Sequence, residues 1–504
     1  MPKSLNKSGR FLINHKVILF CLLLPFLSAG ESHAAGEDVL PEAVRVLMKK
    51  HRIQAGKIGI VVQRLDTHER LVAHRVDTSL NPASIIKIAT AASALDLLGL
   101  THRFETKFMS DGRVEDGVIL GDLYVVGGGD PSMTVERFLL FLNKLRNRGI
   151  REIRGDLVID DFFFDLPPHE PAAFDGAPLK PYNAGAGAFM VNFQTQRVVI
   201  LPQGNIIQAY TEPPNDNFIV RNQIRSGKGR CRNWRGKIRE VLRGDETRMT
   251  LTLKGVFPPR CGEQGFFIRA LEKNAHAAGV FRAFWRRLGG KWLGQWRRGR
   301  APATAQTLAV FESPPLSEVI ASMNKYSNNV IARNLFLSLP AAHSSPPYSI
   351  SEAHQTMSDW LAAVQVNGDG LVIDNGSGLS RKTRITAAQM AHLLRYIWRH
   401  PLRAELAASL PILGLDGTMR KRLKNKKITG EGRFKTGSLS GVKSIAGFLR
   451  DAEARDILIV CIINQNGGRT KAFQDALLQW AHKNTFGRSD LINFSQGRGK
   501  KYRF

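Results

Sequence analysis

Strand-like segments near both ends of the chain constrain the fold more than any other feature. Residues 57–75 read as two β-runs around a polar turn at 66–69, and residues 444–450 and 456–464 form a second pair of apolar runs. If these distant runs pair in one sheet, the domain that contains them is discontinuous. The chain between them then carries an insertion.

The pattern between these strands changes twice. An apolar helix is expected at 84–100, whereas 101–302 shows short β-runs separated by Gly, Pro and Asn turns. Helical patterns return at 314–339, with a break near 325–329, and at 385–400. A length of 504 residues suits two or three domains, so we predict that 101–302 forms a separate β-rich body.

Residues 275–294 interrupt this β-rich body with an amphipathic helical pattern that stops at Gly289 and Gly290. Its Trp and Arg residues fit a membrane or polyanion surface. An exposed helix with a basic, solvated face explains these residues better, and this is what we predict.

The charge balance and the N-terminus together indicate where the chain works. Lys and Arg number 72 against 43 Asp and Glu, a net charge of +29, which attracts polyanions. Residues 1–34 combine basic residues, the apolar run Val17–Leu27 and small residues at Ser32–Ala34. We predict a signal peptide cut after about Ala34, with a membrane anchor as the alternative. An exported chain would meet anionic envelope polymers rather than nucleic acid.

Three cysteines remain beyond the predicted signal peptide. Cys461 lies in an apolar strand-like run and is expected to be a buried small hydrophobe. Cys231 and Cys261 share a loop-rich region, and an oxidising compartment favours a disulfide between them. No Cys-x-x-Cys or His-Glu-x-x-His pattern indicates a metal site.

A serine followed three residues later by a lysine occurs four times. The serines are Ser4, Ser84, Ser322 and Ser440. Ser84 alone opens a long apolar helix, at or near its N-cap, so Lys87 shares its face. Burial, the helix dipole and any second cation would each lower the pKa of Lys87, and a neutral lysine can act as the base for a serine nucleophile.

Two later motifs complete an ordered set. Ser327 and Asn329 form a Ser-x-Asn in the expected break between helices, and Lys435 begins the only Lys-Thr-Gly in the chain. Each motif is weak alone. The order Ser-x-x-Lys, Ser-x-Asn, Lys-Thr-Gly is the signature of penicillin-binding proteins and serine β-lactamases.

With these motifs the sequence resembles the class C penicillin-binding proteins, D-alanyl-D-alanine carboxypeptidase/endopeptidases of the bacterial periplasm. The long interval between Ser84 and Ser327 is similar to that of class C, which holds inserted domains, although 231–300 departs from the family pattern. Further segments that resemble family landmarks are GDLYVVGGGDPS (121–132), PYNAGAGAFMVNF (181–193), NGSGLSR (375–381) and LDGTMRKRL (415–423).

The resemblance implies an α+β, serine β-lactamase/transpeptidase-like domain, an antiparallel sheet with helices on both faces, carrying a β-rich insert. The implied division is a signal peptide (1–34), the first part of this domain (35–100), the inserted body (101–302), the second part (303–485) and a basic tail (486–504). It also implies residence in the periplasm, with no membrane span after signal cleavage.

The implied reaction is attack by Ser84 on D-Ala–D-Ala and cross-linked muropeptide bonds of peptidoglycan, without metal or organic cofactor. Lys87 would be the base, Ser327 a proton relay and Asn329 a holder of Lys87 or substrate. The implied substrate-binding residues are Lys435, Thr436, Gly437 and Ser438. β-Lactams would inhibit by acylating Ser84.

Other interpretations remain. A β-lactamase would share the three motifs, although the long interval between Ser84 and Ser327 argues against this class. A non-catalytic cell-wall-binding protein is a second alternative, but it would not need all three motifs to be intact. In the insert, Asp130, Asp160 and Asp161 would contact the ammonium of a diaminopimelate side chain, or simply serve turns and strand ends, which is the simpler expectation.

Overall fold

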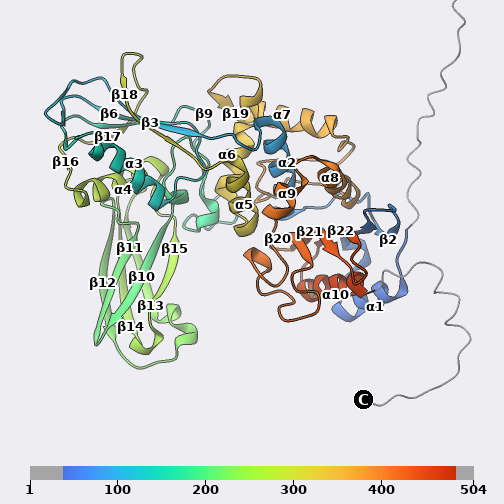
Figure 1. The fold of residues 1–504 in the computed structure, drawn as a ribbon. Helices are drawn as coiled ribbons and strands as arrows, with labels where there is room; N and C mark the ends of the chain where they lie inside the picture. The colour runs from blue at the N-terminus through green and yellow to red at the C-terminus, as the bar shows by residue number, and fades with distance from the viewer. Residues whose placement is uncertain (1–37, 484–504) are drawn as a thin grey trace, which may run out of the picture. The chain divides into compact units, whose positions relative to one another are not determined.

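A computed structural model describes residues 38–483; the predicted signal peptide and basic tail lie outside these residues. One antiparallel five-stranded sheet, in the order β2-β1-β22-β21-β20, joins the two ends of the described chain (Figure 1). Its strands are β1 Ile58–Arg64, β2 Arg70–His74, β20 Gly432–Leu439, β21 Val442–Arg450 and β22 Asp456–Asn464. Ile58 pairs with Ile463, so the predicted pairing of distant strands is confirmed.

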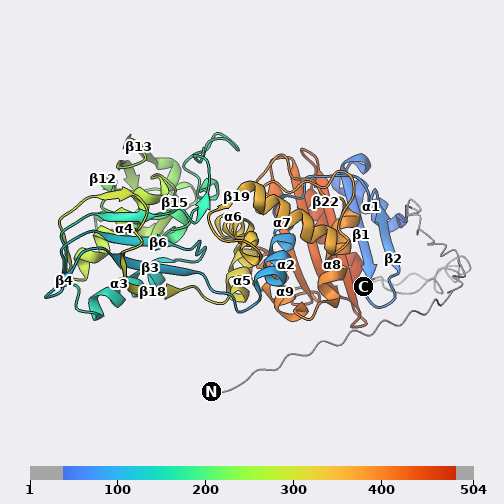
Figure 2. The ribbon, with the colours of Figure 1, turned by 90° about the horizontal axis from the view of Figure 1, so that it is seen from above.

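Helices cover both faces of this sheet (Figures 1 and 2). On one face α1 (Glu42–His51) and α10 (Thr470–Lys483) bury an apolar cluster that includes Met48 and Phe473. On the other face α2 (Lys87–Leu98) and α8 (Ala387–Arg399) enclose a second cluster. The remaining helices of this part are α5 Leu316–Tyr326, α6 Asn329–Ser338, α7 Ile350–Ala363 and α9 Arg403–Ser409. The predicted helix break is confirmed, because α5 ends and α6 begins around Ser327.

The chain leaves this layer after α2 and returns along β18. β3 and β18 are neighbours in a second five-stranded sheet, in the order β17-β8-β6-β3-β18, so the outgoing and returning strands lie side by side. The strands of this sheet are β3 Glu105–Ser110, β6 Leu123–Gly127, β8 Leu157–Asp160, β17 Trp296–Arg298 and β18 Gln306–Glu312. The boundaries at 100/101 and 302/303 stay predictions.

Smaller sheets complete the segment between β3 and β18, and one of them also takes in β19, which follows β18 in the chain. Three of them run in the orders β16-β7-β5-β4, β11-β10-β15 and β12-β14-β13, and β19 pairs with β9. Their strands are β4 Val114–Glu115, β5 Val118–Ile119, β7 Glu152–Ile153, β9 Phe164–Asp165, β10 Gln196–Gln203, β11 Ile206–Glu212, β12 Phe218–Ser226, β13 Ile238–Gly244, β14 Met249–Phe257, β15 Gln264–Ile268, β16 Lys291–Trp292 and β19 Tyr348–Ser349. The predicted β-rich character is confirmed.

One sequence expectation is wrong. The helix expected at 275–294 is α4, Lys273–Arg287, and it packs with α3 (Val135–Asn147) in the core of this segment rather than presenting a solvated face. Phe281 and Trp285 are almost fully buried. Beyond Gly289 and Gly290 the chain forms strand β16, and Trp292 and Trp296 pack against the same core.

Candidate active site

Ser84 and Lys87 lie where a short 3₁₀ turn, Ala83–Ile86, runs into α2. Ser84 therefore lies near the N-cap, as the sequence predicts, two residues before Ile86, which takes that position; no side chain caps the helix. The tighter turn still places the Ser84 Oγ 3.2 Å from Lys87 Nζ. The Lys87 side chain is fully buried, with no exposed surface.

The Lys87 amine has three oxygen neighbours. Asn329 Oδ1 accepts a hydrogen bond from it at 2.7 Å, and the main-chain carbonyl of Ser377 accepts another. A neutral amine has two N–H groups and one lone pair. Because both carbonyl oxygens can only accept, they take the two N–H groups, and the lone pair is left for the Ser84 hydroxyl. The arrangement suits proton transfer from Ser84 to Lys87.

The surroundings favour the neutral form of Lys87. Burial lowers its pKa well below the usual value, and the positive charges of Lys435 and Arg333 lower it further. Burial also lowers the pKa of Lys435, to about 7. Two buried lysines thus share one site without a carboxylate ion-paired to either of them among residues 38–483.

Ser327 occupies the break between α5 and α6. Its backbone is left-handed, with φ 57°, and it ends α5 while Asn328 caps α6 with its side chain. Lys435 Nζ donates to Ser327 Oγ at 2.8 Å and to the carbonyl of Thr436 at 3.0 Å. The turn thus brings the second predicted motif against the third.

The Lys-Thr-Gly segment lies on β20, the last strand at one edge of the sheet. The Phe434 N–H points away from β21 and donates to the carbonyl of Pro411. Because the direction of the N–H groups alternates along a strand, those of Thr436 and Ser438 also point away from β21. Gly437 lets this strand approach the serine, since an added Cβ would lie 2.9 Å from Ser84 N and 2.7 Å from Pro82 O. The Thr436 hydroxyl donates to Thr418, and Lys443 donates to the Ser438 hydroxyl.

All eight predicted site residues therefore come together, on the turn before α2, the α5–α6 break and β20. Sequence reasoning missed three contributors. Ser377 supplies a carbonyl from the NGSGLSR segment, Tyr182 accepts from Asn329 Nδ2 at 3.3 Å, and Arg333 donates to the carbonyl of Ala184. The segments at 181–193 and 375–381 contained Tyr182 and Ser377, but both residues act through main-chain carbonyls, which leave no side-chain signature.

Three predicted aspartates of the insert have internal partners instead. Asp161 forms ion pairs with Lys273 at 2.8 Å and Arg298 at 2.5 Å. Asp130 accepts from Ser132, and Asp160 accepts from the backbone of Ala301. These contacts support the simpler expectation, that the three carboxylates stabilise turns and strand ends.

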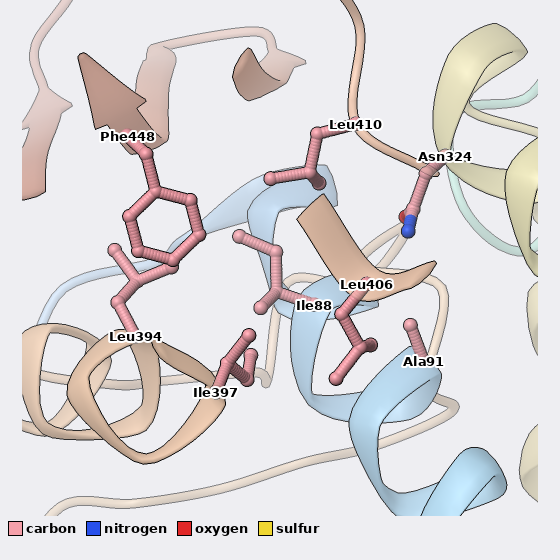
Figure 3. A pocket seen from close by; sticks show the side chains of 8 residues that line it. All are labelled: Ile88, Ala91, Asn324, Leu394, Ile397, Leu406, Leu410 and Phe448. Carbon is pink, nitrogen blue, oxygen red and sulfur yellow. The ribbon is translucent and has the colours of Figure 1, made fainter. Parts of the chain in front are cut away.

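The remaining candidate features add no chemistry to the site. A small cavity beside α2 is lined mainly by apolar side chains of α2, α8, α9 and β21, with Asn324 as its polar member (Figure 3). Asn324 donates to Ser409, and the other lining side chains belong to the apolar cluster between α2 and α8. No cluster of metal-ligating side chains occurs within residues 38–483. Cys231 and Cys261 form a disulfide, and Cys461 is buried in β22.

Comparison with solved structures defines the class of fold. Penicillin-binding protein 4 (dacB) from Haemophilus influenzae superposes with a TM-score of 0.72 at 23% identity, covering 87% of this chain and 99% of that one. The Bd0816 predatory endopeptidase of Bdellovibrio bacteriovorus gives 0.51 at 15% identity, covering 88% and 95%. The predicted transpeptidase-like fold with an antiparallel sheet and helices on both faces is confirmed.

The chain belongs to the D-Ala-D-Ala carboxypeptidase 3 (S13) family, whose model matches residues 40–484. A D-alanyl-D-alanine carboxypeptidase of Actinomadura sp. (strain R39) is 26% identical over 90% of this chain and 88% of its own length. The D-alanyl-D-alanine carboxypeptidase DacB of H. influenzae is 25% identical, over 82% and 86%. The family predicted from the three motifs is confirmed. No helix in the described part is long and apolar enough to cross a membrane.

Proposed function

We propose that the chain is a serine D,D-peptidase of peptidoglycan that acts through an acyl-enzyme on Ser84. The observation that carries this proposal is the Lys87 amine, which is buried, is held by two carbonyl acceptors and lies 3.2 Å from Ser84 Oγ. Membership of the carboxypeptidase family supplies the substrate class, peptides that end in D-Ala–D-Ala.

In the proposed acylation, Ser84 Oγ attacks the carbonyl carbon of the penultimate D-Ala while its proton passes to Lys87 Nζ. The N–H groups of Ser84 and Ser438 stabilise the oxyanion. The proton then passes from Lys87 through Ser327 to the nitrogen of the leaving D-Ala, and the C–N bond breaks. Asn329 keeps Lys87 in place, and Lys435 attracts the terminal carboxylate.

The outer edge of β20 beyond Phe434 supports the proposed binding mode. A peptide that adds to this edge as a further strand would meet the outward N–H groups of Thr436 and Ser438.

Water then attacks the ester and releases the shortened peptide. The same chemistry applies to cross-linked muropeptides, whose bridge also places a D-Ala carbonyl at the scissile bond, and β-lactams would acylate Ser84.

The proposed reaction needs no metal or organic cofactor.

We also propose that residues 35–100 and 303–485 form the peptidase domain, with 101–302 inserted. An N-terminal signal peptide would direct the chain to the periplasm. The neighbouring strands β3 and β18 support the division, because the chain leaves and re-enters the peptidase layer at one place. A cleavage site after about Ala34 is testable by N-terminal sequencing of secreted protein.

Labelling with a fluorescent penicillin tests the function. The wild type is expected to form a covalent adduct, and Ser84→Ala is expected to form none. Ser322→Ala is the matched control, because Ser322 also has a lysine three residues on, Lys325, but is exposed on α5. No label on the wild type, or equal labelling of Ser84→Ala, contradicts the proposal.

Two substrates separate the alternatives. Release of D-Ala from a muropeptide pentapeptide is expected of a D,D-peptidase. Rapid, repeated turnover of nitrocefin would instead favour a β-lactamase, and neither activity together with binding to cell wall would favour a non-catalytic binding protein.

A further inference from the structure

The sheet β12-β14-β13 has one face in the core and one face in solvent (Figure 1). The core face is apolar and includes Phe218, Leu253 and Phe257. Because side chains alternate along a strand, the residues between them point outward. The outward face carries five exposed cations, which we call the basic face: Arg221, Arg225, Arg239, Arg243 and Lys254.

No acid balances the basic face. Its remaining outward positions, between and beside the cations, are Ile219, Gln223, Thr250, Thr252, Val241 and Val256. None of the five cations forms an ion pair with a carboxylate described in residues 38–483. Glu240 of β13 alternates to the other side and pairs with Arg235.

The register increases the repulsion. Arg239 lies directly opposite Lys254 in the antiparallel pair β13–β14, with Arg243 two positions further along the same face. Like charges that are directly opposed across two strands destabilise a sheet. If this face only had to be soluble, a mixture of acidic and basic side chains would be more stable. The repulsion between like charges therefore indicates a surface adapted to bind an anion.

The connection from β12 to β13 extends the charge beyond the end of the sheet. Lys228, Arg230 and Arg232 are exposed there. The disulfide from Cys231 to Cys261 fixes this connection to the segment after β14. The residues from 221 to 243 thus contain nine Lys and Arg against one acid, on a held backbone rather than on a loose tail.

The composition of the face selects the kind of partner. Four of its five cations are arginines, whose planar guanidinium groups bind phosphate oxygens in pairs. Their spacing over three neighbouring strands suits several anionic groups in a row rather than one small ion. No aromatic side chain points outward among the eleven positions given above, so the anchors that hold proteins in a lipid surface are missing from this face.

We propose that the basic face binds a phosphate-bearing polymer of the cell envelope. Binding there would hold the enzyme at the wall independently of Ser84. The proposal does not depend on the peptidase chemistry, since none of the five cations belongs to the site around Lys87.

Binding to long-chain inorganic polyphosphate as the probe tests the proposal, over a series of salt concentrations. The triple variant Arg221→Gln, Arg239→Gln, Lys254→Gln is expected to bind about tenfold more weakly, with a shallower salt dependence. The control Lys49→Gln, Lys50→Gln, Lys57→Gln removes the same charge from exposed positions outside this sheet and is expected to bind like the wild type. Both variants are expected to keep the wild-type rate of penicillin labelling, which reports folding.

A footprint on the wild type keeps the test valid if the triple variant does not fold. Bound polyphosphate is expected to protect Lys254 and Lys228 from acetylation, while Lys49 and Lys50 stay reactive. Absence of binding, equal binding by both triple variants, or an unprotected Lys254 overturns the proposal. Binding to phosphatidylglycerol vesicles without binding to polyphosphate also overturns it, because the partner would then be a membrane.

Discussion

The Asn329 side-chain oxygen lies 2.7 Å from Lys87 Nζ, and the nitrogen of the same amide donates to the carbonyl of Tyr182. One amide thus connects the proposed base to a segment between β3 and β18. One helical turn later, Arg333 donates to Ala184 in that segment. The inserted part of the chain therefore borders the site and holds two α6 side chains in place.

Arg333 is expected to control the pH at which Ser84 is acylated. Burial and the charge of Lys435 lower the pKa of Lys87, and the charge of Arg333 lowers it further. Burial lowers the pKa of Arg333 itself to about 10, although the Asp374 carboxylate opposes this shift. Arg333→Met removes this charge, so the pKa of Lys87 rises and less of the lysine is neutral at a given pH. The acidic limb of the penicillin-acylation profile, where Lys87 loses its proton, should move to higher pH, while Arg333→Lys should keep it near the wild type.

A purely structural role for Arg333 would give a different result. Loss of its contact with Ala184 alone would slow acylation by the same factor at every pH, without moving the limb. The limb belongs to the coupled groups Lys87 and Lys435 rather than to one lysine.

Lys435→Met is expected to abolish D-Ala release and to stabilise the protein below neutral pH. In the folded protein the pKa of Lys435 is about 7, against about 10.4 for an unfolded lysine. The unfolded chain therefore binds the proton more tightly, and the stability of the wild type rises between pH 7 and pH 10. The variant should exceed the wild type by about 2–4 kcal/mol at pH 6, and the gap should close above pH 10.

Denaturant unfolding at pH 6 and pH 10 measures this difference. Lys49→Met, at an exposed position on α1, is the control and should show no such pH-dependent gain. A Lys435→Met variant that is less stable than the wild type at pH 6 would contradict the expectation.

Gly437→Ala should slow acylation at least about a hundredfold. The added Cβ would lie 2.2 Å from Ser444 Oγ and 2.9 Å from Ser84 N, so β20 or the serine must shift. A misplacement of about 1 Å near reacting atoms costs this much. The rate of penicillin labelling measures it, and Gly56→Ala, whose Cβ would meet no atom within 4 Å, should label normally. Normal labelling of Gly437→Ala would show that β20 does not approach the serine this closely.

Replacement of Cys231 and Cys261 by serine should lower stability without changing the labelling rate at 25 °C. The disulfide spans 30 residues, and closing a loop of this size stabilises a folded chain by about 2–4 kcal/mol. Thermal unfolding of the double variant measures the loss, and wild type treated with a reducing agent should behave in the same way. If the two differ, the substitutions act through something other than the disulfide.

Much of the catalytic layer was predictable from sequence because its signals are local. Strands β1, β21 and β22 are continuous apolar runs with turns at their ends, and three short motifs indicated the residues that surround Lys87. Only the pairing of β1 with β22 needed a longer inference. It followed from the occurrence of similar strands at both ends.

Other features could not be predicted because they depend on contacts between distant segments. The Ser377 carbonyl reaches Lys87 only after the segment at 375–379 packs on α2, where Thr90 donates to Gly376. The pattern of α4 looked amphipathic, yet neighbouring sheets bury nearly all of it, which no single-helix pattern reveals. For Arg333, the sequence indicates a charged residue on a helix, but it does not indicate that this charge lies near Lys87.

The pairing of Ile58 with Ile463 also determines when the site can form. The sheets of the segment between β3 and β18 pair almost entirely within that segment, so they can begin to fold before the last strands are made. The catalytic sheet must wait until β20, β21 and β22 have been made, because β1 has no neighbour on that side before then. A chain interrupted before β20 lacks Lys435 and the edge strand beside Ser84, so the site described above cannot form in it.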